Sequence, residues 1–286
     1  MNINRITVFG GGTLGAQAAL QFALYGKQVT VLGRSDNSLE KALSRIRAYS
    51  KKYEEETSFT AEEVLRAQKS IKVSSCPKEA LSDTDLVFEC TSESREVKKQ
   101  VLETIEANID SDEVVVATNS STLLPSSLAK YLKDGSRFLA IHLANEIWKR
   151  STAEIMPHPG TKPELMDDVA RFVKEVGLTP VPLMKEQPGY ILNSLMIPWL
   201  RAGLDLAATG VASPKDIDAV WEAVMGSEGP FRVVDIVGLR TIVSVLSLEV
   251  EAGIEGSQRI IDYLTEAYIS KGCLGVENGK GIYDYS

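Results

Sequence analysis

The stretch RITVFGGGTLGAQAALQFALYGKQVTVL, residues 5–32, decides the fold. It predicts a short buried strand, a glycine loop, a helix and a second apolar strand in direct succession. Gly10-x-Gly12-x-x-Gly15 between a strand and a helix is typical of a turn that binds the pyrophosphate of a dinucleotide. A glycine-rich turn of another α/β fold is the alternative.

Each glycine of this turn has a mechanical role. Gly10 permits the tight turn out of the strand, Gly12 lets the backbone approach a pyrophosphate, and Gly15 lets the helix lie close on the sheet. Thr13 and Leu14 lie within this loop, and a helix is expected over residues 16–25, whose N-terminus favours phosphate charge. We expect all five residues to bind the cofactor.

The end of the second strand bears on the choice of cofactor. NAD-binding folds place an Asp or Glu there, bonded to the ribose 2′-hydroxyl. This chain has Gly33-Arg34-Ser35 instead, and Asp36 comes three residues late. A guanidinium and a hydroxyl suit a 2′-phosphate. We therefore expect NAD(P)(H), with a preference for NADP(H); the alternative is that Arg34 only stacks on adenine or faces water.

Length and composition exclude several classes of protein. The chain has 286 residues, 44% hydrophobic and 24% charged, as in soluble globular proteins. Without a run of 18 apolar residues we expect no membrane span. A net charge of -8 without a basic cluster argues against nucleic acid. The three cysteines fit neither a disulfide framework nor a zinc site, so we expect no metal and a cytoplasmic location. The chain enters its first strand at once, and we expect no signal peptide.

Strands and helices alternate through residue 184, which predicts a doubly wound, mostly parallel α/β sheet. From Tyr190 onward only helices are expected, among them one continuous helix over residues 234–251. Gln187-Pro188-Gly189 is a plausible boundary. We predict a Rossmann domain over residues 1–186 and an all-α domain over residues 187–286, whose apolar surface packs on a second copy. The acidic residues 54–56 are expected in a loop or on a solvated face.

Candidate chemistry centres on one of only two histidines. His142 follows an apolar strand at its carboxyl end, where ligands bind in open α/β sheets. Glu154 lies twelve residues later inside the next short strand, and a buried carboxylate needs a partner. An imidazole that takes a hydroxyl proton, oriented by a carboxylate, is a general acid–base pair. A core histidine with satisfied hydrogen bonds is the alternative.

Three further polar residues have weaker claims. Ser121 lies in a loop after a parallel strand, at the ligand edge, or it caps a helix. Asn193, four residues into the second domain's first helix, is expected at the cleft, with an exposed helix position as the alternative. His158, in a Pro-His-Pro-Gly turn, is expected in a surface loop.

At these residues the chain resembles the 3-hydroxyacyl-CoA dehydrogenase family over essentially its whole length. The matching stretches are VFGGGTLGA (residues 8–16), NSSTL (119–123), IHLAN (141–145), PGYILN (188–193), GPF (229–231) and GKGIY (279–283). The resemblance implies a Rossmann domain with a helical dimerisation domain, and hence a homodimer.

The resemblance also implies roles for individual residues. The family's catalytic His and Glu fall on His142 and Glu154, and its substrate-contacting Ser and Asn on Ser121 and Asn193. On the cofactor side, the implied residues are Glu93, Lys98, Asn119 and Asn145.

One departure changes the expected substrate. Where the family usually has His-Phe-Phe-Asn-Pro, this chain has His142-Leu-Ala-Asn-Glu146, which is more similar to the diketoreductase-like branch. The sequence predicts hydride transfer between a nicotinamide and a 3-hydroxyacyl or 3-ketoacyl compound, which can be a CoA thioester. The alternatives are an enzyme for non-CoA keto esters or for sugar acids, of the gulonate-dehydrogenase type, and a non-catalytic dinucleotide-binding protein.

Overall fold

A computed structural model describes residues 1–285, which form two compact units that divide between Ile191 and Leu192. The boundary proposed from the sequence, between residues 186 and 187, lies a few residues earlier. The residues between the two positions contact the first unit. The backbone N–H of Gln187 donates to the Met156 sulfur, and that of Ile191 donates to Glu154.

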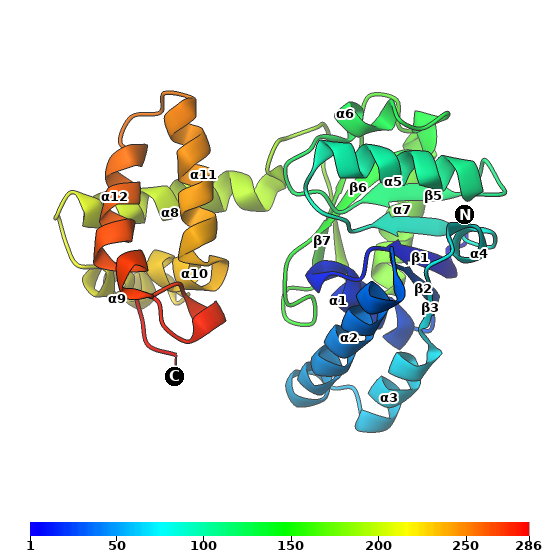
Figure 1. Cartoon of the computed structure of the whole chain (residues 1–286), viewed down its shortest axis with the longest axis horizontal. Coiled ribbons are helices and arrows are strands. Elements are labelled where there is room, and N and C mark those ends of the chain that lie inside the picture. The colour runs from blue at the N-terminus through cyan, green and yellow to red at the C-terminus, as the bar shows by residue number, and fades with distance from the viewer. Residues whose placement is uncertain (286) are drawn as a thin grey trace. The chain divides into compact units, whose positions relative to one another are not determined.

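Within the described residues, the first unit holds an eight-stranded sheet in the order β3-β2-β1-β4-β5-β6-β7-β8 (Figure 1). Neighbouring strands run parallel except β6 and β7, which are antiparallel. This confirms the predicted fold class. The strands are β1 (Arg5–Phe9), β2 (Gln28–Leu32), β3 (Lys72–Ser74), β4 (Leu86–Glu89), β5 (Val115–Thr118), β6 (Phe138–Leu143), β7 (Thr152–Met156) and β8 (Thr179–Pro182).

Helices cover both faces of the sheet, as Figure 1 shows for α1–α3 on one side and α5 and α6 on the other. One face packs on α1 (Thr13–Leu24), α2 (Asp36–Glu56), α3 (Ala61–Ser70) and α7 (Pro163–Glu175). The other packs on α4 (Pro77–Leu81), α5 (Arg95–Asn108) and α6 (Pro125–Ala129), with a short 3-10 turn at Gly135–Arg137. The acidic residues 54–56 form the exposed last turn of α2, so they lie on a solvated face, which is one of the two expectations, and not in a loop.

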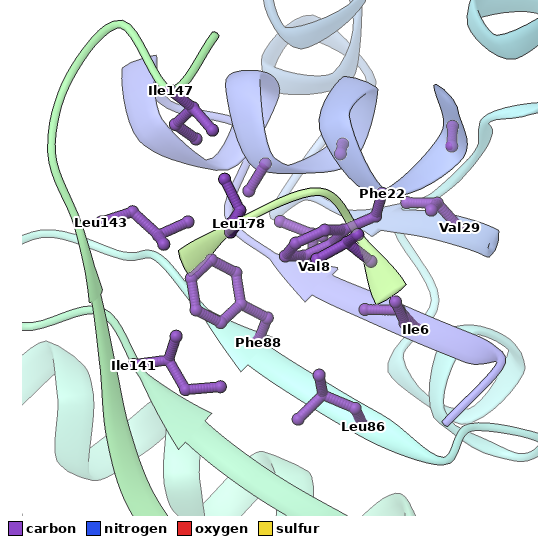
Figure 2. Packing of buried hydrophobic residues seen from close by; sticks show 14 of the residues in the cluster. Ile6, Val8, Phe22, Val29, Leu86, Phe88, Ile141, Leu143, Ile147 and Leu178 are labelled. Carbon is purple, nitrogen blue, oxygen red and sulfur yellow. The ribbon is translucent and has the colours of Figure 1, made fainter. Parts of the chain in front are cut away.

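The larger core lies between the sheet and α1 (Figure 2). Phe22 from α1 stands edge-on to Phe88 of β4 and to Phe172 of α7, with ring centroids 5.6 and 5.4 Å apart. Burying each such ring stabilises the fold by about 1.5–3 kcal/mol. The strands contribute further residues to this core, including Ile6, Val8, Leu86, Ile141 and Leu143. This packing fixes the carboxyl ends of β1, β4 and β6, where the candidate site residues begin.

The second unit is helical and has its own core. Its helices are α8 (Tyr190–Ala208, which begins in the first unit), α9 (Pro214–Met225), α10 (Pro230–Val237), α11 (Leu239–Glu251) and α12 (Ser257–Ala267), followed by 3-10 turns at Ile269–Lys271 and Val276–Asn278. The expected single helix over residues 234–251 is wrong. Gly238 breaks it with φ 91° and ψ 131°, a conformation that glycine tolerates and that ends α10 before α11 begins.

Among residues 1–285, no helix combines the length and the apolarity that are needed to cross a bilayer.

Candidate functional site

The glycine loop joins β1 to α1 in the way that the motif predicts. A Cβ added at Gly15 would lie 1.8 Å from the carbonyl oxygen of Gly10, so only glycine fits there. At Gly12, by contrast, a Cβ would meet nothing within 4 Å. Gly12 is also the N-cap of α1, and no side chain caps the helix. The N-terminus of α1 therefore has no side-chain cap and has open space beside Gly12, which fits a pyrophosphate.

The residues expected at the adenosine ribose lie where β2 meets α2. Arg34 is exposed. The Ser35 hydroxyl accepts a hydrogen bond from the Ser38 N–H in a capping box that begins α2. Its own proton is still available to a ligand. Arg45, near the middle of α2, donates to the carbonyl of Gly11, so its guanidinium borders the glycine loop.

His142 and Glu154 stand directly opposite each other on β6 and β7. The imidazole Nδ1 lies 2.9 Å from Glu154 Oε2, and both residues are 6% exposed. Beside a carboxylate, Nδ1 is assigned as the proton-bearing nitrogen, which leaves Nε2 free to exchange a proton. Ser121 Oγ lies 3.2 Å from Nε2. The structure therefore brings three predicted residues together.

Glu154 and His142 are held from a further direction by the turn that begins α8. The backbone N–H of Ile191 donates to Glu154 Oε1 at 2.8 Å. The ring of Tyr190 stacks on the His142 ring with centroids 4.3 Å apart and planes 14° apart. The Tyr190 hydroxyl donates to the Ser120 carbonyl at 2.6 Å. We assigned no role to Tyr190 from the sequence, although it lies within the PGYILN stretch.

Glu93 organises the loop that carries Ser121. One of its carboxylate oxygens accepts hydrogen bonds from the Ser120 hydroxyl (2.5 Å), from the backbone N–H of Thr122 (2.8 Å) and from the Thr122 hydroxyl (2.7 Å). Burial alone would raise the pKa of Glu93, but these hydrogen bonds hold the pKa below its usual range. The carboxylate therefore acts here as an ionised anchor of the loop.

Lys98 is buried beneath this loop at 1% exposure. Its Nζ lies 2.7 and 3.0 Å from the two oxygens of Glu89, which is 0% exposed. Glu89 also accepts from the Thr118 hydroxyl at 2.6 Å and from the Thr91 backbone N–H at 2.7 Å. We missed Glu89 from the sequence; its only signal was a carboxylate at the end of an apolar strand. This network joins the carboxyl ends of β4 and β5.

The other predicted residues have different surroundings. Asn119 accepts the N–H of Leu143 through its Oδ1 at 3.0 Å, which ties the loop after β5 to β6. Asn145 is exposed in the loop after β6, and Asn193 belongs to α8 in the second unit. The loop containing Ser121 leads to α6, whose N-cap is Leu124. Ser121 therefore does not cap that helix.

His158 lies outside the site. It is half-buried in its turn, where Nε2 is 2.8 Å from the Gly135 carbonyl and Nδ1 accepts the Gly160 N–H. No group of three or more His, Cys, Asp or Glu side chains that could hold a metal ion occurs in residues 1–285.

Comparisons with known proteins agree along the whole chain. Residues 5–187 match the NAD-binding domain of 3-hydroxyacyl-CoA dehydrogenase, and residues 189–285 match its C-terminal domain. The mitochondrial hydroxyacyl-coenzyme A dehydrogenase of Rattus norvegicus is 28% identical over 291 residues, covering 99% of this chain and 91% of the relative. A probable 3-hydroxybutyryl-CoA dehydrogenase of Bacillus subtilis (strain 168) is 27% identical, covering 100% and 98%.

A solved structure of a diketoreductase, described with substrate-directed dual catalysis of dicarbonyl compounds, is also similar. It has 37% identity, a TM-score of 0.93 and full coverage of both chains. The similarity thus includes the fold and extends over the whole chain. The chain belongs to the 3-hydroxyacyl-CoA dehydrogenase family of NAD-binding oxidoreductases.

Proposed function

We propose that this protein interconverts 3-hydroxyacyl and 3-ketoacyl compounds, among them CoA thioesters, with His142 as general acid and base. The observation that carries the proposal is the His142–Glu154 pair, with Nδ1 bonded to the carboxylate and Nε2 beside Ser121. The pair lies at the carboxyl edge of the sheet that also carries the open glycine loop.

In the oxidative direction Nε2 of His142 takes the proton of the substrate hydroxyl. The buried Glu154 carboxylate stabilises the imidazolium that forms and keeps the ring in the correct tautomer. Ser121 donates a hydrogen bond to the reacting oxygen or the neighbouring carbonyl, where negative charge develops, and the family resemblance implies the same role for Asn193. The bound nicotinamide supplies or accepts the hydride. In reduction His142 returns the proton to the developing alkoxide.

The first test is the loss of reduced-nicotinamide absorbance with acetoacetyl-CoA. We expect turnover by the wild type and a loss of about 10²–10⁴-fold in kcat for His142→Ala, the range for removal of a general acid. Glu154→Gln should also lower kcat. His158→Gln is the matched control, because it changes the other histidine and should leave turnover unchanged. Undiminished turnover by His142→Ala would exclude the mechanism.

A second candidate is a reductase of free keto esters or dicarbonyl compounds. The 37% identity to a diketoreductase and the Leu143-Ala144 pair in place of two phenylalanines favour it. Turnover of keto esters without turnover of acetoacetyl-CoA would establish this reading. Turnover of a sugar acid alone would favour a dehydrogenase of the gulonate type. Cofactor binding without turnover of any of these substrates would favour a non-catalytic dinucleotide-binding protein.

We further propose that the cofactor is NADP(H). Arg34 and Ser35 stand at the carboxyl end of β2, where NAD-binding folds have a carboxylate, and the N-terminus of α2 adds favourable potential for a phosphate. The faster of NADPH and NADH in the same assay tests this choice.

A homodimer formed through the helical unit is also proposed. This unit exposes apolar side chains at helical spacing, such as Val220 and Val224 on α9 at 68% and 76% exposure. A mass of one chain, 31.2 kDa, in light scattering at micromolar concentration would contradict it.

A further inference from the structure

One aromatic side chain, Tyr190, contacts both His142 and the loop that carries Ser121. The Tyr190 ring lies flat on the His142 ring, 4.3 Å between centroids, and is 1% exposed. Its backbone has φ 55°, a left-handed conformation that is uncommon for a residue with a side chain. Such a conformation persists where the surroundings fix it, and it often marks a functional position. Here it aims the ring at the imidazole.

Resting on the proposed general acid–base role of His142, we propose that Tyr190 is a positioning residue that clamps the imidazole and favours its protonated form. The face of an aromatic ring carries negative charge density and attracts a cation that lies over it. The imidazolium formed during hydroxyl oxidation is such a cation. Glu154 bonds to the edge of the imidazole ring, and Tyr190 covers a face that the carboxylate does not reach.

The groups around His142 come from three elements. Glu154 faces it from β7, Ser121 from the loop after β5, and Tyr190 from the start of α8. Glu93 does not contact the imidazole directly; it accepts a hydrogen bond from the hydroxyl of Ser120, the neighbour of Ser121. Burial raises the pKa of the Tyr190 phenol, and the nearby Glu93 and Glu154 carboxylates raise it further. The ring next to the imidazole is therefore a neutral phenol throughout the working range of pH.

The hydroxyl of Tyr190 has a separate task. It donates to the Ser120 carbonyl at 2.6 Å, and the next residue, Ser121, lies against Nε2 of His142. A phenylalanine would keep the ring over the imidazole and release this loop. A leucine would fill most of the space and remove both the ring and the hydroxyl. These two substitutions therefore separate the two tasks.

The direct measurement is an NMR titration of the histidine ring protons, because the chain has only two histidines. His158→Gln assigns the two signals. In Tyr190→Leu we expect the midpoint of the His142 titration to move to lower pH by roughly half a unit to one unit, since the cation loses its aromatic partner. In Tyr190→Phe the midpoint should stay in place. The His158 signal is an internal control and should not move. An unchanged or higher His142 midpoint in Tyr190→Leu would overturn the proposal.

Kinetics provide the second readout. With acetoacetyl-CoA or the best keto ester, Tyr190→Leu should shift the pH profile of kcat/KM in the same direction as the NMR midpoint. Tyr190→Phe should lower kcat several-fold without a shift in the profile, because only the placement of Ser121 changes. If His142→Ala is inactive and Tyr190→Leu keeps the wild-type profile, this inference fails while the proposed function stands. If His142→Ala is fully active, the proposed function itself fails.

Discussion

The ammonium of Lys98 lies 2.7 Å from Glu89 and 4.0 Å from Glu93, so its shortest ion pair is with the deeper carboxylate. The family resemblance places Lys98 on the cofactor side. Its burial and its two hydrogen bonds to Glu89 indicate that it also holds the carboxyl ends of β4 and β5 together.

Removing one partner of this pair should be costly. Lys98→Met leaves the Glu89 carboxylate buried without its cation, and we expect the free energy of unfolding to fall by about 3–5 kcal/mol. In the double variant Glu89→Gln, Lys98→Met, the loss should be clearly smaller than in Lys98→Met alone. Urea unfolding followed by circular dichroism measures both. Wild-type stability of Lys98→Met would show that the pair does not support the fold.

The glycine loop allows stability to be separated from cofactor binding. Gly12→Ala should leave the unfolding temperature within a few degrees of wild type, because its Cβ enters open space. The same Cβ occupies the position of a pyrophosphate, so the affinity for NADPH should fall at least tenfold. Gly15→Ala should lower both the unfolding temperature and the affinity for NADPH, because its Cβ would collide with the Gly10 carbonyl. Fluorescence titration with NADPH and thermal unfolding give the two readouts, and normal affinity in Gly12→Ala would place the cofactor elsewhere.

Arg34 decides between the two nicotinamide cofactors if it binds a 2′-phosphate. A charge-assisted hydrogen bond contributes about 1.5–3 kcal/mol, so Arg34→Ala should raise the KM for NADPH by about 10–100-fold and leave the KM for NADH within twofold. Arg47→Ala, exposed farther along α2, removes the same charge and serves as control. Equal rises for both cofactors would mean that Arg34 stacks on the adenine that they share.

The lowered pKa of Glu93 should make the free energy of unfolding depend on pH. Its pKa is held below the ordinary value of 4.5 in the folded protein, so its stabilising effect is present above the unfolded pKa and is lost as pH falls through the folded value. Glu93→Gln should therefore be less stable than wild type at pH 7, and the gap should close below about pH 4.5. Urea midpoints measured between pH 7 and pH 3.5 test this. Glu103→Gln, exposed on α5, should retain the pH dependence of the wild type. A gap that stays constant over this range would show that the Glu93 charge is not what stabilises the loop.

Local signals in the sequence were sufficient for the glycine loop and for the succession of strands and helices along the first unit. Gly10-x-Gly12-x-x-Gly15 depends on contacts within one strand, turn and helix, and such contacts leave a pattern. The break between α10 and α11 at Gly238 leaves a weaker pattern in the sequence, because the apolar spacing continues across the glycine. Only the backbone conformation of that glycine separates the two helices.

Contacts between distant segments could not be read in the same way. Tyr190 reaches His142 and Ser120 from 48 and 70 residues away in the sequence, and nothing in its immediate neighbours indicates either contact. Glu89 is a similar case, because its role depends on hydrogen bonds from Lys98 of α5 and Thr118 of β5. Such residues have ordinary local surroundings and acquire their role only through the tertiary fold.

The antiparallel step between β6 and β7 has a consequence for how this enzyme family can diversify. Strand register alone sets His142 opposite Glu154, while residues 144–151 connect the two strands. A slip of one residue in β7 would turn the acid to the other face of the sheet, so selection must preserve the register. The connecting segment is not part of this register, although the backbone N–H groups of Glu146 and Ile147 anchor it to Gln17. Laboratory evolution in search of new substrates can therefore vary the exposed residues 149–151 of this segment while His142 and Glu154 stay opposite each other.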